Sequence, residues 1–348
     1  MNCHLPRFAW PLVLAVLMVA PRQALAWNGP DHALVTQLAV AGLPDSVPAF
    51  VREGGSLMAH CSRDPDLFKI PVGGDSDLVQ TESPEHYIDL ERLGSDEPPA
   101  TRFEILAWAV RHNLTPGQIG LGPYAIIEWT QRLTVAFAET RRWPDDPDVR
   151  TKTLVYAGLL AHYAGDLCQP LHTTIHFNGR ARPDGSSPQT GIHLKVDDLP
   201  HKLPPNIHIK LDPAALKPFG DLRRGVWATV QAAHALVDRV YTLEHDLPDA
   251  GQPIVPDSAV AELARERTQA SAAFVAQLIV TAWVDSAQVR LPRWHDRPVS
   301  VARVYQWQDR PVSASPAAAA KLPPAAALAT SATAPLSASP GPQAGPGS

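Results

Sequence analysis

The sequence has few cysteines, no excess of basic residues and no long hydrophobic run. Only 3 of its 348 residues are cysteine, which argues against a thiolate zinc finger or an iron–sulfur site. Lys and Arg number 30 against 35 Asp and Glu, for a net charge of −5, so a large basic surface for duplex nucleic acid is not expected. Hydrophobic residues make up 45%, enough for a core. The 14 histidines leave a site of imidazoles and carboxylates open.

Residues 1–26 are typical of a secretory signal peptide. Arg7 precedes an apolar stretch, Phe8–Ala20, and the sequence Ala24–Ala26 has the A-x-A form of a cleavage site. A membrane-spanning helix is the alternative, but this stretch is too short to cross ~30 Å of hydrocarbon. We therefore predict cleavage after Ala26 and a secreted or periplasmic protein. We expect no later segment to anchor the chain in a membrane.

The remaining chain divides by composition into one domain and a tail. Residues 27–296 have the composition of a single large domain without internal repeats. Residues 297–348 become rich in Ala, Pro and Ser, a composition that buries too little apolar surface to offset the entropy of ordering. We predict a flexible tail there, and a monomer without an obligate protein partner.

The domain is predicted to be all-α. Apolar residues recur at three- and four-residue spacing in several long stretches, and convincing alternating strand patterns are absent. The helices are expected at Pro30–Val40, Gly117–Thr140, Asp148–Gln169, Ala214–Leu247 and Asp257–Val289. Two segments rich in Gly, Pro and Asp, Leu67–Glu85 and His176–Lys210, read as long loops of functional importance.

The clearest chemical motif stands at the end of one predicted helix. His162 and Asp166 are four residues apart, so their side chains share one face and can hold one ion, and His172 follows six residues later. His193 and Asp197 repeat the four-residue spacing. A third candidate group joins Asp64, Asp66 and His86.

Taken singly, each of these residues has a simpler explanation. A lone buried histidine is more often a hydrogen-bonded core residue, and a His/Asp pair can be a surface ion pair. The conjunction of several such pairs favours metal binding. Cleavage after Ala26 would add the free amine of Trp27, five residues before His32, and a deprotonated amine binds zinc.

The sequence resembles a known superfamily in an ordered series of residues. The series is Trp27, His32, Asp66 and His86, then the H-x-x-x-D-x-x-x-x-x-H block from His162 to His172, then the H-x-x-x-D/E pair of His193 and Asp197. The superfamily joins the secreted zinc-dependent single-strand-specific nucleases of fungi and plants to bacterial zinc-dependent phospholipase C. The resemblance covers residues from Trp27 to about Val289 and implies an all-α fold with three zinc ions in one cleft. It implies one ion on Asp66, His86, His162 and Asp166, another on His172, His193 and Asp197, and a third on Trp27, His32 and the bridging Asp166.

The activity implied by the resemblance is hydrolysis of phosphodiester bonds. The zinc ions would acidify a water and polarise the phosphoryl oxygens. Asp66 would orient the attacking water, and Lys69 would stabilise the transition state. The alternative for Lys69 is a solvated loop lysine. Residues 27–296 are accordingly predicted to be a zinc-dependent phosphodiesterase domain.

Single-stranded DNA or RNA is the predicted substrate, and phospholipid is the alternative. The short interval from Trp27 to His32, together with Lys69 and Asp197, favours the nuclease branch, whereas Gly191 matches the phospholipase branch. A nuclease also needs an aromatic slot for an unpaired base. Phe177 and Tyr87 are candidates, with a core role favoured for Tyr87. A non-catalytic metal-binding envelope protein is the alternative of another class.

Two cysteines and several other histidines of the domain lie near the proposed ligands in sequence. Cys61 and Cys168 flank two proposed ligands of one ion, Asp66 and Asp166, so we predict that they approach each other, which would allow a disulfide. The other histidines near His193 match no motif and are expected to be loop or surface residues; they are His176, His201 and His208.

Overall fold

The computed structural model describes residues 28–72, 76–94 and 97–296. The chain separates into two compact units, Met1–Leu291 and Pro292–Ser348. The second unit is described only over its first five residues, which include the short 3-10 helix η5 (Arg293–Asp296). The predicted signal peptide, Trp27 and the predicted tail over 297–348 lie outside the described residues.

The first unit is built from helices, and the described residues contain isolated bridges but no strand. This confirms the all-α prediction. In chain order the elements are α1 (Gly29–Ala41), α2 (Ala49–Glu53), α3 (Gly55–Cys61), α4 (Asp64–Phe68), α5 (Asp77–Glu82), η1 (Ser83–His86), α6 (Leu90–Leu93), α7 (Arg102–Arg111), α8 (Pro116–Ile119), α9 (Gly122–Arg142), α10 (Pro147–Asp166), η2 (Pro170–Thr173), α11 (Ile192–Asp197), α12 (Leu222–His234), α13 (Val237–Thr242), η3 (Glu244–Asp246), α14 (Ala259–Asp285) and η4 (Ser286–Gln288).

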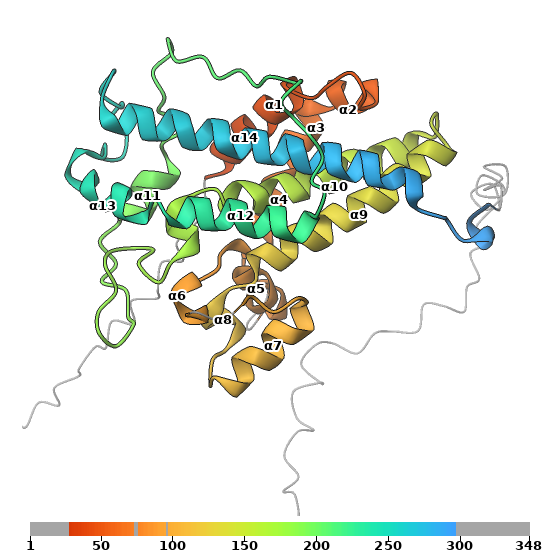
Figure 1. Cartoon of the computed structure of the whole chain (residues 1–348). Coiled ribbons are helices and arrows are strands. Elements are labelled where there is room, and N and C mark those ends of the chain that lie inside the picture. The colour runs from red at the N-terminus through yellow and green to blue at the C-terminus, as the bar shows by residue number, and fades with distance from the viewer. Residues whose placement is uncertain (1–27, 73–75, 95–96, 297–348) are drawn as a thin grey trace, which may run out of the picture. The chain divides into compact units, whose positions relative to one another are not determined.

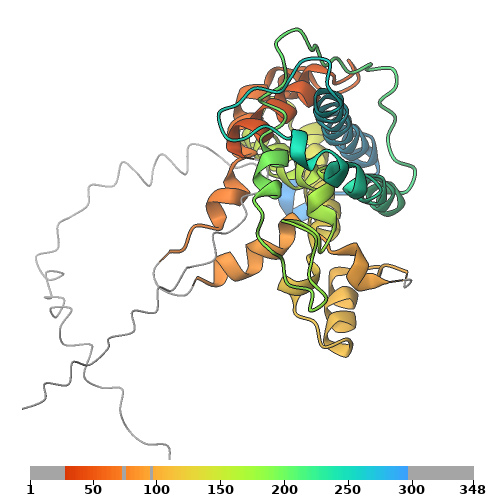
Figure 2. The same cartoon turned by 90° about the vertical axis from the view of Figure 1, so that its left-hand side faces the viewer.

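Three long helices form the centre of this unit. Helices α9, α10 and α14 pack on one another, and α1 and α3 pack on α10 (Figures 1 and 2). Helix α10 therefore has neighbours on several sides, and its last ten residues, 157–166, are all buried. Side chains near its end face protein rather than water, so any polar group there needs a partner.

Local sequence signals explain where α10 begins and ends. Asp146 caps it by accepting hydrogen bonds from the backbone N–H groups of Asp148 and Val149, and Pro147 occupies the first turn. The helix ends at Asp166, four residues before Pro170, where the missing N–H and the ring oppose continuation. Its end therefore lies directly at the His162/Asp166 pair.

A glycine lets α3 approach α10 closely. A Cβ atom at Gly158 would lie 2.6 Å from the Met58 carbonyl oxygen and 2.8 Å from the Cys61 Cβ. Those distances are too short for a side chain, so α3 and the turn after it can rest against α10 only because residue 158 lacks one. The site residues that follow α3 are positioned by this contact.

Three expectations about the elements were wrong in detail. The helix predicted from Ala214 begins only at Leu222, because Pro218 and Gly220 precede it and Asp221 supplies the cap. The predicted loop Leu67–Glu85 contains α5. Helix α7 was not predicted, although Thr101 and Glu104 form a capping box at its start.

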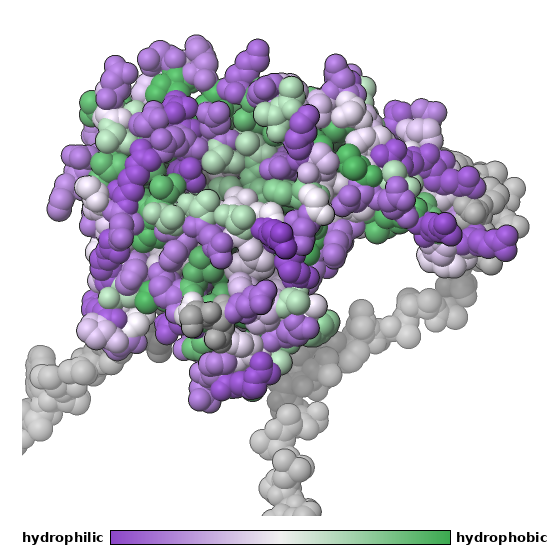
Figure 3. Space-filling view, viewed as in Figure 1, coloured by the Kyte–Doolittle hydropathy of each residue, from purple (hydrophilic) through white to green (hydrophobic). Residues whose placement is uncertain are grey.

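The last long helix is hydrophobic enough to span a membrane. The stretch Ala259–Gln288 is long and apolar enough by length and composition alone. Its most apolar window has a mean hydropathy of 1.4, and 61% of that window is buried. This differs from the expectation that no later segment is long and apolar enough. Its packing against α9, α10 and α1 accounts for the apolar composition as that of a core helix. On the face in Figure 3, hydrophilic residues are interspersed with hydrophobic ones.

Candidate metal centre

Eight predicted ligands converge at one end of α10. They come from elements far apart in sequence, and all of them except Asp66 are buried. They are His32 on α1, Asp66 on α4, His86 on η1, His162 and Asp166 on α10, His172 on η2, and His193 and Asp197 on α11. Their roles as ligands remain a prediction, as does that of Trp27, which lies outside the described residues.

The first group surrounds the end of α10. The His162 Nε2 lies 3.0 Å from the His86 Nδ1 and 3.3 Å from the Asp166 Oδ2, and the latter two atoms are 2.9 Å apart. Asp66 Oδ1 is 3.9 Å from His162 Nε2 and 4.0 Å from His86 Nδ1. The other Asp166 oxygen lies 3.3 Å from the His32 Nε2, so this carboxylate faces two groups of ligand atoms at once.

The second group is built from η2 and α11. The His172 and His193 Nε2 atoms lie 3.1 Å apart. Asp197 Oδ2 is 3.2 Å from His193 Nε2, and Asp197 Oδ1 is 3.7 Å from His172 Nε2. His193 and Asp197 lie one turn apart on α11, a short helix within the segment His176–Lys210 that was expected to be a loop. Ligands held about 2.1 Å from a tetrahedral zinc ion stand roughly 3.3 Å apart, which these separations approach.

The ring orientations provide the strongest test of whether the residues fit a metal. The Nδ1 atoms of three histidines donate to backbone carbonyl oxygens: His162 to Ser62, His172 to His86, and His193 to Phe177. A carbonyl oxygen can only accept, so each of these Nδ1 atoms carries the ring's proton. In the neutral His172 and His193 rings the Nε2 lone pairs then face each other across 3.1 Å, an arrangement that a shared cation stabilises.

Burial keeps the second pair of rings neutral. It lowers the pKa of both His172 and His193, so a proton between their Nε2 atoms is disfavoured. Burial also raises the pKa of Asp197 to about 7, because the surrounding protein groups do not fully replace the water that an ionised carboxylate loses. A divalent cation would relieve both effects.

Asp166 behaves differently because it lies among several rings. Burial opposes its ionisation, but the neighbouring His162 and His172 hold the pKa of Asp166 well below its ordinary value. At the same time, burial and then the nearby His162 lower the pKa of His32 to about 4. The centre therefore offers an ionised carboxylate beside a neutral ring, the protonation states that a metal requires.

Lys69 is not a solvated loop lysine. Only 6% of its surface is exposed, and its Nζ lies 2.7 Å from the Asp66 Oδ1. The alternative considered from sequence is therefore wrong. A buried ammonium group beside the metal centre is positioned to attract a phosphoryl oxygen.

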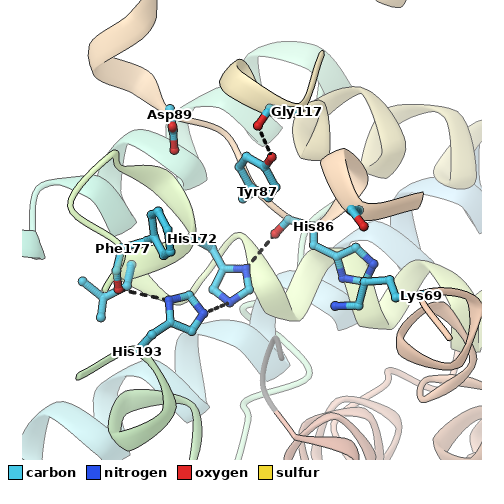
Figure 4. Close-up of a pocket in the computed structure, with 10 residues that line it drawn as sticks. Lys69, His86, Tyr87, Asp89, Gly117, His172, Phe177 and His193 are labelled. Atoms are coloured by element: carbon cyan, nitrogen blue, oxygen red, sulfur yellow. Dashed lines mark hydrogen bonds between the residues drawn. The ribbon is translucent and has the colours of Figure 1, made fainter. Parts of the chain in front are cut away.

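A pocket of about 270 Å³ opens beside these residues. Figure 4 shows its wall, in which Lys69, His86, His172 and His193 are joined by Tyr87, Asp89 and Phe177. The core role favoured for Tyr87 is wrong, because its ring lines the pocket and its hydroxyl donates to the Gly117 carbonyl oxygen at 2.6 Å. Burial, with Glu91 adding to it, raises the pKa of Asp89 to about 7. The pocket thus combines two aromatic faces with a carboxyl group.

The conformation of Gly191 explains its residue type. Its φ angle of 88° is left-handed, and its N–H donates to the Asn178 Oδ1 at 2.7 Å. Glycine adopts this conformation without strain, and asparagine is the next most tolerant residue. The glycine at this position is thus explained partly by the backbone, so it is weak evidence for the phospholipase branch.

The disulfide considered from sequence is absent. Cys61 and Cys168 are both free thiols. Cys61 packs against Gly158, which precedes Cys168 by ten residues, or roughly 15 Å at the rise of a helix. Cys168 instead lies near Ser271 and Arg267 on α14. The ligands that these cysteines flank meet, but the thiols point to different neighbours.

Several supporting groups were missed by sequence reasoning. The Gln169 Nε2 donates to the Asp197 Oδ1 at 2.7 Å, and its own oxygen accepts from the Leu171 N–H. Glu82 lies behind His86. Outside the centre, exposed His201 donates to the buried Asp31 carboxylate, which agrees with the expected surface position of His201. Of these groups only Gln169 had a local signal, because it lies within the H-x-x-x-D-x-x-x-x-x-H motif between Asp166 and His172.

The comparisons with known proteins reach only distant structures. No protein-family model and no curated protein matches the chain. Among solved structures, the alpha toxin from Clostridium absonum matches with 13% identity and a TM-score of 0.43, covering 76% of this chain and 65% of the toxin. The alpha-toxin of Clostridium perfringens from avian strain SWCP matches with 13% identity and a TM-score of 0.40, over 74% and 65%.

This chain therefore spans about 65% of the length of either toxin. A likeness of this degree carries no argument about activity. Neither neighbour is described as a nuclease, so the comparisons give the nuclease prediction no support.

Proposed function

We propose that this protein is a zinc-dependent hydrolase of phosphodiester bonds. The observation that carries the proposal is the facing of the His172 and His193 Nε2 atoms at 3.1 Å, while the Nδ1 of each ring donates to a backbone carbonyl oxygen. A second pair of ring nitrogens, His162 Nε2 and His86 Nδ1, lies 3.0 Å apart. Both pairs lie beside a pocket that could admit a substrate. We further propose export from the cytoplasm, on the composition of residues 1–26.

The donor set suits zinc. Imidazole nitrogens and carboxylate oxygens in groups of three or four, mostly buried, are typical zinc ligands. Asp66, His86, His162 and Asp166 would hold one ion, His172, His193 and Asp197 a second, and His32 with Asp166 and the Trp27 terminus a third. Bound zinc supplies an acidified water and a Lewis acid for phosphoryl oxygens.

The chain's own residues would complete the site. Asp66 is the one partly exposed carboxylate among the ligands, so it can accept a hydrogen bond from an attacking water and orient it. Lys69 lies against the same carboxylate and would approach the non-bridging phosphoryl oxygens, where negative charge accumulates in the transition state. The apolar and aromatic pocket wall would exclude bulk water from the reacting bond.

Single-stranded nucleic acid is one candidate substrate. The rings of Tyr87 and Phe177 line the pocket next to His86 and His193, and aromatic faces bind unpaired bases by stacking. Asp89 in the same wall can form hydrogen bonds with base edges. These residues support a nucleotide beside the metal centre.

Phospholipid is the second candidate. Three aliphatic side chains close to Lys69 in sequence are strongly exposed: Leu67 at 56%, Ile70 at 55% and Val72 at 75%. Exposed aliphatic groups on one short segment favour contact with an apolar surface. They support a substrate that is presented by a lipid layer.

An activity panel tests the proposal and separates the two substrates. The protein beginning at Trp27, loaded with zinc, is assayed on single-stranded DNA, RNA and phosphatidylcholine vesicles, with a chelator-treated sample as the control. We expect zinc-dependent cleavage in at least one assay. Tight zinc binding without cleavage of any of these substrates would instead favour the non-catalytic metal-binding protein.

A further inference from the structure

A carboxylate and a phenol lie behind one of the proposed zinc ligands. Glu82 is the last residue of α5, and its side chain is 12% exposed. Its Oε1 accepts a hydrogen bond from the Tyr163 hydroxyl at 2.5 Å and lies 3.6 Å from the His86 Nε2. Tyr163 follows His162 directly on α10. The neighbouring residues His162 and Tyr163 thus act on opposite sides of the His86 ring. His162 lies next to Nδ1, and Tyr163 binds the carboxylate that faces Nε2.

The two nitrogens of His86 face different surroundings. Nδ1 faces the ligand atoms of His162 and Asp166, at 3.0 and 2.9 Å. Nε2 is buried and has no hydrogen-bond partner. If Nδ1 is to bind a cation, it must be unprotonated, and the ring's proton then resides on Nε2. That N–H points towards Glu82.

The 3.6 Å between the His86 Nε2 and the Glu82 Oε1 is longer than a hydrogen bond. A small rotation of either side chain would bring the two atoms within hydrogen-bond distance. A cation on Nδ1 makes the Nε2–H a stronger donor, and a carboxylate in this position is the usual outer partner of a zinc-bound imidazole. Tyr163 restrains the carboxylate, because its hydroxyl holds the same oxygen that faces His86. The hydroxyl is the donor of this pair, because a carboxylate oxygen can only accept.

We propose that Glu82 is a positioning residue that fixes the ring of His86 for metal binding, and that Tyr163 holds Glu82 in place. This rests on the proposed function, because it assumes that His86 binds zinc. Glu82 and Tyr163 touch neither the ion nor a substrate; they act through His86. Loss of the carboxylate leaves the His86 N–H buried without its acceptor and the ring free to turn.

The test is a measurement of zinc affinity. Metal-free wild-type protein is titrated with zinc against a chromophoric chelator, in parallel with Glu82→Ala, Glu82→Gln and Tyr163→Phe. Asp77→Asn is the matched control, since it removes a carboxylate from the exposed start of the same helix. We expect Glu82→Ala to weaken one of the zinc sites by at least about tenfold. Glu82→Gln, which keeps an acceptor, should give an intermediate loss.

Two further measurements separate positioning from folding. Thermal unfolding of the metal-free variants should match that of Asp77→Asn, and the spectrum of the cobalt-substituted Tyr163→Phe protein should differ from wild type at one site. Zinc affinities of Glu82→Ala and Tyr163→Phe within twofold of wild type would overturn the proposal. If wild-type protein itself binds no zinc, the proposed function fails as well, so the two failures are distinguishable.

Discussion

The Nε2 atoms of His172 and His193 face each other at 3.1 Å, while each ring donates its other nitrogen's proton to a backbone carbonyl group. Two lone pairs at this distance repel unless a cation or a proton lies between them. Because burial lowers the pKa of both rings, a metal ion fits the arrangement better than a proton does.

Removing zinc should destabilise the protein. Each site saturated at 100 times its dissociation constant contributes about 2.7 kcal/mol, so chelation should lower the Tm by at least about 5 °C for a domain of this size. His193→Ala should abolish part of this difference, because it removes a ligand of the second group. His208→Ala, at an exposed position, serves as the control. Equal Tm values with and without chelator in the wild-type protein would contradict the prediction.

Zinc binding at the second group should weaken as the pH falls. Burial raises the pKa of Asp197 to about 7 in the metal-free protein, so below pH 7 the ion must displace a proton from this carboxyl group. The lowered pKa values of His172 and His193 mean that these rings are already neutral and compete less. We expect the affinity to fall up to about tenfold per pH unit below pH 7, with proton release seen by calorimetry in two buffers.

The same titration on Asp197→Asn isolates the carboxyl group. That variant should bind zinc more weakly at this group but lose the proton release that depends on residue 197. Unchanged proton release at pH 6 would show that another group titrates.

Lys69→Ala should reduce turnover without removing zinc. In the wild-type protein the Lys69 ammonium group lies 2.7 Å from the Asp66 carboxylate and lines the pocket, where it can stabilise negative charge on a phosphoryl group. Loss of one such donor costs roughly 10²–10³ in kcat. Zinc content should equal that of wild type, and Lys210→Ala, at an exposed position, should retain full activity. Loss of zinc in step with activity would instead assign Lys69 a structural role at Asp66.

Gly158→Ala should destabilise the fold through the contact between α3 and α10. The new Cβ would meet the Met58 carbonyl oxygen at 2.6 Å, and such overpacking typically costs about 1–3 kcal/mol. Urea unfolding measures the effect. Gly220→Ala is the control, because the space around its Cβ is open. A Gly158→Ala protein as stable as the control would show that α3 can move aside freely.

The sequence was most informative where its signals are local. The starts of α1, α10 and α14 lie within two residues of their predicted positions, because proline and capping residues mark their first turns. The helix predicted from Ala214 was too long, because Pro218 opposes helix formation before Leu222. The four-residue spacings of His162/Asp166 and His193/Asp197 likewise require only a helical turn.

Other parts of the site depend on contacts between distant segments. Nothing near Glu82 in the sequence indicates that it meets Tyr163, 81 residues later. The Ser62 carbonyl oxygen can accept the hydrogen bond from the His162 Nδ1–H because Gly158 lets α3 approach α10. The cysteine pairing failed for the same reason. Proximity of two ligands does not fix the direction of a neighbouring side chain.

The most direct test of the account is the zinc content of the protein that begins at Trp27, purified without chelators and measured by elemental mass spectrometry against protein concentration. Three zinc ions per chain are expected, held by the eight side chains at the end of α10 and by the free terminus. Fewer than two zinc ions per chain, in protein shown to be folded, would contradict this expectation.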